Sequence, residues 1–196
     1  MRNNESSSSR FIVALIMIAA LIIVGLVVLL IASSVSERDV LVFEYPATQG
    51  GEIISEDYYH VKDIKNSYRG GWLLKKTVIV AAEYRGKPVK AIEKIKSEHV
   101  EKIIIENGVE IITRSAFIGD ISLKEVVVPA SITSIERLAF KDCDSLTTIK
   151  YDGTMEQWNA IEKSDTWYIS TPAFKVICTD GEIEYPADER QYVNSW

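Results

Sequence analysis

The N-terminal part of the chain contains one long, uninterrupted apolar run. From Phe11 to Ser34 the sequence FIVALIMIAALIIVGLVVLLIASS has no charged residue and no proline, and it is apolar on every side of a helical wheel. At ~1.5 Å rise per residue, the stretch from Phe11 to Ile31 covers roughly 30 Å, the thickness of a hydrocarbon core. The pattern predicts a transmembrane helix over residues 11–34.

A cleaved signal peptide is the alternative, because Ala32 and Ser34 form a small-x-small pattern that a signal peptidase accepts. Secretory apolar regions usually run about 7–15 residues, so the longer run favours an uncleaved signal anchor. Arg2 and Arg10 precede the helix, and only Arg38 follows it closely. By the positive-inside rule, we expect a single-pass protein of the cell membrane with a cytoplasmic N-terminus and the remainder extracellular.

Beyond the anchor, the apolar positions repeat with an offset of 23 residues. Residues 100–122 and 123–145 superpose at seven positions in each unit. The inward positions of the two units are Val100, Ile103, Ile105, Val109, Ile112, Ala116 and Phe117, followed by Leu123, Val126, Val128, Ile132, Ile135, Ala139 and Phe140. A third copy opens with Leu146, Ile149 and Tyr151, and a degenerate earlier unit, residues 77–99, retains Val89 and Ile92 but has Lys96-Ser97 in place of Ala-Phe.

One such unit cannot bury its apolar face alone, so the repeats must stack as a solenoid. The L-x-x-L-x-L rhythm of Leu123, Val126 and Val128 predicts one strand per unit in a parallel sheet, followed by a second extended piece and a tight helical turn. The predicted fold class is a single N-terminal transmembrane helix followed by a short leucine-rich-repeat solenoid. Its parallel β coils of about 23 residues carry short helical turns, in a β-rich, α/β horseshoe-like arrangement of about four coils.

At the C-terminal end, Thr154 and Gln157 have the spacing of a capping box, which predicts a short helix. Trp158 and Ile161 would then cover the last coil, and the run AFKVICTDGEI from Ala173 predicts a closing strand. The full predicted organisation is a cytoplasmic head (1–10), the transmembrane anchor (11–34), a juxtamembrane linker (35–56), an N-terminal hairpin with the degenerate first repeat (57–99), the repeats (100–151), a C-terminal cap (152–185) and a tail (186–196).

These residues resemble the BspA-like leucine-rich-repeat family of bacterial surface proteins. The resemblance lies in EYRGKPVKAI, in the units of form V-P-x-x-I-x-x-I-x-x-x-A-F-x-x-C, and in the end LTTIKYDGTMEQWNAIEK…TPAFKVICTDGEI. Glu106 stands where Pro129 stands one unit later, and Asp120 stands where Cys143 does. The resemblance implies a right-handed solenoid that binds or adheres at the bacterial surface.

The net charge of the chain narrows the class of binding partner. The chain has 22 basic and 28 acidic residues, and removal of Arg2, Arg10 and Glu5 leaves a net charge of −7 beyond the membrane. This balance disfavours nucleic acid as a partner, because nucleic-acid binding requires a basic footprint.

Cys143 and Cys178 lie in the part of the chain that we expect to be exported, where disulfides are permitted. Their apolar surroundings favour buried free thiols. The oligomeric state is left open.

The sequence offers little catalytic chemistry. Neither His60 nor His99 lies in a metal-ligand spacing, and no nucleophile elbow, P-loop or dinucleotide-binding motif is present. The carboxylates of Glu101, Glu106, Glu125 and Asp152 could pair across coils as glycoside hydrolysis requires, but we interpret them as residues of a solvated strand face. We therefore expect no enzyme activity, no cofactor and no metal.

The alternation of the strands defines a candidate binding surface. If the repeat positions point inward, their neighbours point outward, with Ile104 and Val127 side by side. The predicted outward stripe is Lys102, Ile104, Glu106, Glu125, Val127, Thr148, Lys150 and Asp152. These residues favour a membrane-anchored extracellular module that binds protein or glycan. The alternative is a structural or regulatory membrane subunit whose repeats mediate assembly.

Overall fold

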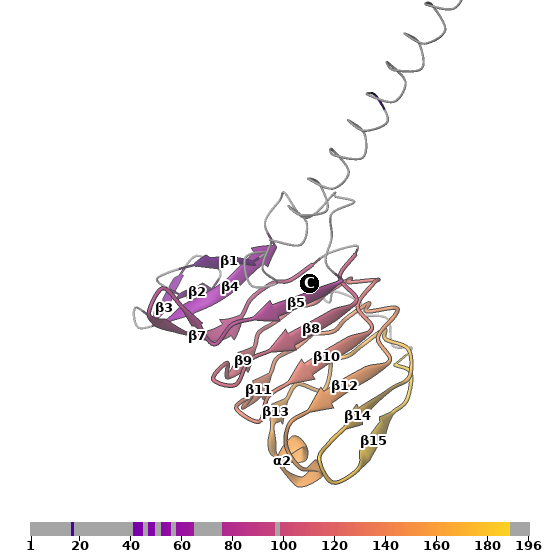
Figure 1. Ribbon diagram of the computed structural model, residues 1–196. Coiled ribbons are helices and arrows are strands. Elements are labelled where there is room, and N and C mark those ends of the chain that lie inside the picture. The colour runs from indigo at the N-terminus through magenta and orange to yellow at the C-terminus, as the bar shows by residue number, and fades with distance from the viewer. Residues whose placement is uncertain are drawn as a thin grey trace, which may run out of the picture. The chain divides into compact units, whose positions relative to one another are not determined.

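A computed structural model of the chain (Figure 1) describes residues 17, 41–44, 47–49, 52–55, 58–64, 76–96 and 99–188. The chain divides into two compact units, residues 1–36 and 37–196. The predicted transmembrane segment 11–34 lies outside the described residues, apart from Met17. Among the residues that are described, no helix is both long enough and apolar enough to cross a membrane.

The second unit is a β-solenoid of about four coils in which two sheets face each other (Figure 1). One sheet has six strands, of which all but the last run parallel. In spatial order its strands are β5 (Thr77–Val80), β8 (Lys102–Ile105), β10 (Glu125–Val128), β12 (Thr148–Tyr151), β14 (Phe174–Ile177) and the antiparallel β15 (Glu182–Tyr185). Each coil contributes one strand to this sheet, as the 23-residue offset predicts.

The other sheet has seven strands and forms the opposite side of the coils. Its path is β1 (Leu41–Glu44), β4 (Tyr59–Ile64), β7 (Lys87–Ile92), β9 (Ile111–Ile112), β11 (Ser134–Ile135) and β13 (Glu162–Lys163), with β6 (Glu83–Tyr84) pairing β7. The solenoid is therefore built from two sheets joined by turns. The short strands β9, β11 and β13 are the second extended piece that the sequence predicts for each unit, and turns follow β9 and β11 as expected.

The core lies between the two sheets and contains every predicted inward position. All fourteen positions of the two complete units are buried, with exposed fractions of 0–2%. The apolar residues with which the third copy begins are buried as well: Leu146, Ile149 and Tyr151. In the degenerate unit, Val89 and Ile92 are also buried. The sequence offset therefore identified the core correctly.

The turns between coils are held by bonds to the neighbouring coil. In the third coil, alternate amides bond within the turn to carbonyls three residues earlier, as in Ala139 N to Glu136 O at 3.3 Å. The amides between them bond to the next coil, as in Phe140 N to Trp167 O at 2.8 Å. Hydroxyl groups also join the coils: Ser131 Oγ donates to Val109 O at 2.6 Å. These bonds satisfy backbone groups that a buried turn would otherwise leave unpaired.

The repeat departure at Asp120, which stands where the next unit has Cys143, keeps the position buried. Asp120 and Cys143 are both fully buried; an Asp120 carboxylate oxygen accepts from Ser122 N at 3.3 Å, and the Cys143 thiol donates to Phe117 O at 3.1 Å. Cys143 and Cys178 are free and buried, which confirms the expectation of free thiols.

The short helix predicted from the capping box is confirmed. Helix α2 (Met155–Ala160) begins after Thr154, whose hydroxyl accepts from Gln157 N at 3.2 Å while the Gln157 side chain accepts from Thr154 N at 2.8 Å. Trp158 on this helix is fully buried. Strand β14 closes the parallel part of the sheet, and β15 turns back along it.

The N-terminal expectations need correction. Residues 35–56 are not only a linker, because they contain β1 and the hairpin of β2 (Ala47–Gln49) and β3 (Glu52–Ser55). Leu41 is buried in the core and Phe43 stacks on Tyr84 with ring centroids 4.1 Å apart. Among the described residues of 57–99, β4 and β5 do not pair as a hairpin: β4 pairs with β1 and β7, whereas β5 joins β8 in the other sheet.

Candidate functional site

The outward side of the six-stranded sheet, here called the outer face, carries most of the predicted stripe. Its strands alternate buried and partly exposed side chains, as the period of two requires. Six predicted residues lie on it: Lys102, Ile104, Glu125, Val127, Thr148 and Lys150. Glu106 and Asp152 follow the ends of β8 and β12 and lie at the margin of this face.

Strand register places apolar side chains next to one another across three coils. Val127 pairs with Ile104, as predicted, and Ile104 pairs with Ile79 of the first coil. We call these three half-buried residues the apolar row. The row continues with Lys150 and then Ile177. Ile79 was missed from sequence because its unit is degenerate, although the alternation of TVIV carries the signal.

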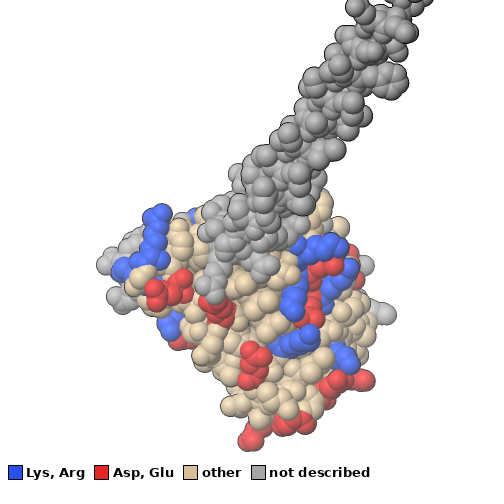
Figure 2. All heavy atoms as spheres, in the orientation of Figure 1, with Lys and Arg blue, Asp and Glu red and all other residues tan. Residues whose placement is uncertain are grey.

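Beside the apolar row, two glutamates each bridge two lysines of neighbouring coils. Glu101 contacts Lys76 at 2.7 Å and Lys124 at 3.2 Å. Glu125 contacts Lys102 at 2.7 Å and Lys150 at 3.1 Å. We call these two sets the charged ladders. Figure 2 shows blue and red side chains gathered over the starts of the strands, beside a continuous uncharged area.

The lysines keep both bridging carboxylates ionised. Hydrogen bonds from Lys76 and Lys124 hold the pKa of Glu101 below its usual range, and the bond from Lys102 does the same for the pKa of Glu125 against the opposing effect of burial. Two of the four carboxylates considered as a possible acid pair, Glu101 and Glu125, are therefore engaged with lysines, and their arrangement is that of a surface ion-pair network.

Glu106 has a different role from the rest of the stripe. Its carboxylate turns back to the preceding coil and accepts from the backbone N–H of Ala82 at 3.1 Å. Pro129 occupies the corresponding place one unit later. This bond across the coils gives a structural reason for the departure at Glu106, and it directs the carboxylate toward the turn between β5 and β6.

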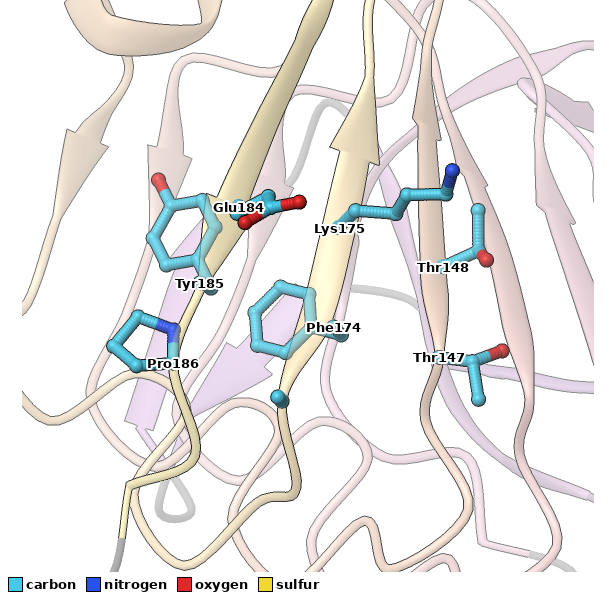
Figure 3. A pocket seen from close by; sticks show the side chains of 8 residues that line it. Thr147, Thr148, Phe174, Lys175, Glu184, Tyr185 and Pro186 are labelled. Atoms are coloured by element: carbon cyan, nitrogen blue, oxygen red, sulfur yellow. The ribbon is translucent and has the colours of Figure 1, made fainter.

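The charged ladders lead toward a shallow groove of about 580 Å³ at the C-terminal corner of the sheet (Figure 3). Register continues from Glu125 to Thr148, then to Lys175 and Glu184. The groove is lined by Thr147, Thr148, Ala173, Phe174, Lys175, Glu184, Tyr185 and Pro186. Sequence reasoning missed this feature because it depends on the β14–β15 pairing.

The aromatic side of the groove is held by a ring stack and a hydrogen bond. Phe174 and Tyr185 stack with ring centroids 5.0 Å apart and planes 1° apart. The Tyr185 hydroxyl accepts from the indole N–H of Trp158 at 2.9 Å, and burial raises the pKa of Tyr185. The groove therefore combines a fixed apolar wall with the hydroxyls of Thr147 and Thr148 opposite (Figure 3).

The two histidines considered in the sequence, His60 and His99, give no evidence of a metal site among the described residues. His99 is exposed, and the side chain of His60 lies outside the description. Within the described ranges, no group of three or more His, Cys, Asp or Glu residues is arranged to hold a metal ion.

The comparisons agree with this architecture. Residues 94–164 match the family model described as the BspA type leucine rich repeat region (6 copies). Over these residues the chain is similar to BspA-type leucine-rich repeats, a class of repeat that commonly mediates protein interaction. The match begins after most of the first coil, in agreement with the degeneracy of that unit. No curated protein and no solved structure matches the chain.

Proposed function

We propose that the protein is a membrane-anchored, extracellular and non-catalytic binding module whose outer face contacts a protein partner at a bacterial surface. The observation that carries the proposal is the apolar row of Ile79, Ile104 and Val127, which lies in register across three coils on one face of the sheet. Side chains so aligned offer a partner a continuous apolar contact, and neighbouring lysines add polar contacts at its border.

The location rests on the sequence. Residues 11–34 form an uncharged apolar run long enough to span a bilayer, and the Arg2 and Arg10 pair precedes it. With that orientation the repeats are outside the cell. The adhesive role follows from the combination of an anchor with a binding face, since an anchored module can hold its partner at the surface.

Binding is tested by using the full-length chain, kept in a non-ionic detergent, to capture proteins of the cell surface. Val127→Glu places a charge in the apolar row, whereas Ile121→Glu makes the same change at a side chain that is 53% exposed in a turn. A partner captured by the wild type and by Ile121→Glu but lost with Val127→Glu supports the proposal. A partner retained equally by all three chains contradicts it.

Location is tested by protease shaving of intact cells that express the chain with a C-terminal tag. Loss of the tag supports an extracellular module. Before protease is added, the tagged protein should have the mass of the uncleaved chain, which supports an anchored one. Full protection in intact cells, with digestion after lysis, places the repeats inside the cell and overturns the extracellular reading.

A further inference from the structure

The charged ladders are locally basic although the chain is acidic. The two charged ladders contain four lysines and two glutamates, a local net charge of +2, whereas the whole chain has a net charge of −6. The lysine side chains are exposed to different degrees, from 36% at Lys102 to 72% at Lys76, while the glutamate side chains are 24–31% exposed. An approaching ligand therefore meets the cations first.

The ladders leave donor capacity on the lysines. In each glutamate, one carboxylate oxygen contacts a lysine of one coil and the other oxygen contacts a lysine of another coil. Each lysine contacts one carboxylate oxygen in these ladders, and an ammonium group has three N–H donors. Additional carboxylates can thus bind between the lysines without breaking the existing ion pairs.

Apolar contact lies next to this charge. Glu125 and Val127 are two residues apart on β10, so their side chains are separated by roughly 6.6 Å along the strand, and both belong to the outer face. Successive coils are ~4.8 Å apart across the sheet. Acidic and apolar side chains of one extended segment can therefore reach the ladders and the apolar row together.

We propose that the outer face binds an extended acidic polypeptide segment that carries apolar side chains, an inference that rests on the proposed function. Its carboxylates contact Lys102, Lys124 and Lys150, and its apolar side chains contact the apolar row. The end of the segment reaches the groove beside Phe174 and Tyr185. A peptide of this kind fits because its carboxylates can pair with the lysines while its other residues supply apolar side chains for the apolar row.

Other ligand classes fit this face less well. Nucleic acid carries dense charge that the net charge of −6 opposes, and it offers no aliphatic side chains to the apolar row. Glycans present hydroxyl groups to a row that has no polar side chain at Ile79, Ile104 or Val127. A second copy of the chain would bring the same lysines into opposition if the two faces paired symmetrically.

The test uses the full-length chain in a non-ionic detergent and a short fluorescent peptide that repeats Glu-Glu-Leu-Leu. Two control peptides repeat Glu-Glu-Ser-Ser, with the same charge, and Lys-Lys-Leu-Leu, with the opposite charge. The variant Lys124→Gln/Lys150→Gln removes two ladder cations. The matched variant Lys94→Gln/Lys96→Gln removes two exposed lysines located away from the outer face.

We expect the Glu-Glu-Leu-Leu peptide to bind, with anisotropy titrations showing about tenfold weaker binding for the ladder variant and for the serine peptide. The Lys94→Gln/Lys96→Gln chain should bind like the wild type, and added salt should weaken binding. Equal binding of the serine peptide or the lysine peptide would overturn the inference. So would equal weakening by both double variants, or a dimer in sedimentation that the ladder variant abolishes.

The two proposals fail separately. If Val127→Glu abolishes capture of the surface partner while Lys124→Gln/Lys150→Gln leaves it unchanged, the outer face is a binding surface and the acidic ligand class is wrong. If neither variant changes capture of a partner that the wild type binds, the proposed binding face itself is wrong.

Discussion

Phe117 and Phe140 occupy the same position in two successive coils, and their ring centroids lie 4.9 Å apart. Both side chains are fully buried. Phe140 also meets Trp167 of the next coil in an edge-to-face contact at 5.6 Å. This aromatic column links three coils, so the loss of one ring affects packing on both sides.

Phe140→Ala should lower the free energy of unfolding by about 3–5 kcal/mol, because it removes a large buried side chain and leaves a cavity. The measurement is guanidinium unfolding of the full-length chain, followed by circular dichroism. Ile121→Ala, at a side chain that is 53% exposed, is the control and should change stability by less than about 0.5 kcal/mol. Equal effects of the two changes would show that the column does not stabilise the coils.

The two thiols should be unreactive in the folded protein. Burial raises the pKa of both Cys143 and Cys178, and Asp120 and Asp180 add to the respective shifts. At pH 8 little thiolate is available, so iodoacetamide should label neither residue until denaturant is added. Ile121→Cys supplies an exposed thiol as the positive control. Rapid labelling of the native chain, or absence of both thiols after non-reducing denaturation, would contradict the structure.

The capping box of α2 makes a separate contribution. Thr154→Ala removes the hydroxyl that accepts from Gln157 N, and loss of such a cap costs about 1 kcal/mol. Thr154→Ser keeps the acceptor and should retain most of that stability. Chemical denaturation of the three chains measures the difference; an alanine variant as stable as the serine variant would show that the cap is energetically neutral.

The ladder at Glu125 should make stability depend on pH. Its folded pKa lies below the usual value, so its contribution is present above the unfolded pKa of about 4.3 and is lost as pH falls through the lower folded value. Glu125→Gln should therefore reduce the free energy of unfolding by roughly 0.5 kcal/mol at pH 7 and by progressively less in acid.

The control for the pH profile is Glu184→Gln, at an exposed glutamate of β15. Unfolding is measured from pH 7 down to strongly acidic conditions for all three chains. A constant difference between wild type and Glu125→Gln across that range would mean that the ladder does not couple protonation to folding.

The core of the repeats could be predicted from sequence because identical side-chain environments recur every coil. A one-residue error in register would have exposed positions such as Val126 and Val128, which are fully buried. The capping box was equally readable, since it depends on two residues three positions apart. Local and periodic sequence signals were therefore sufficient to predict the buried positions in the middle of the solenoid and the short helix near its C-terminal end.

The N-terminal pairing could not be predicted because strand partners there are distant in sequence. The runs that form β4 and β5 look like the arms of a hairpin, yet β4 pairs with β7 and β5 with β8. The short strand β1 also lacks a strong signal, although Leu41 reaches the core.

The outer-face strand residues followed from alternation, but the charged ladders did not. Lys76, Glu101 and Lys124 precede their strands, and which lysine contacts which glutamate depends on long side chains. The groove required the β14–β15 pairing, which brings Glu184 beside Lys175. Whether the stripe binds a partner stays a prediction.

Site-specific photo-crosslinking on intact cells tests the central claim most directly. A photoreactive residue replaces Val127 on the outer face or, as a control, half-buried Ile111 on the seven-stranded sheet. The account predicts a discrete crosslinked partner at position 127 that external protease can digest, and little or none at position 111. Equal crosslinking at both positions, or a product only at position 111, would contradict the assignment of the outer face as the binding surface.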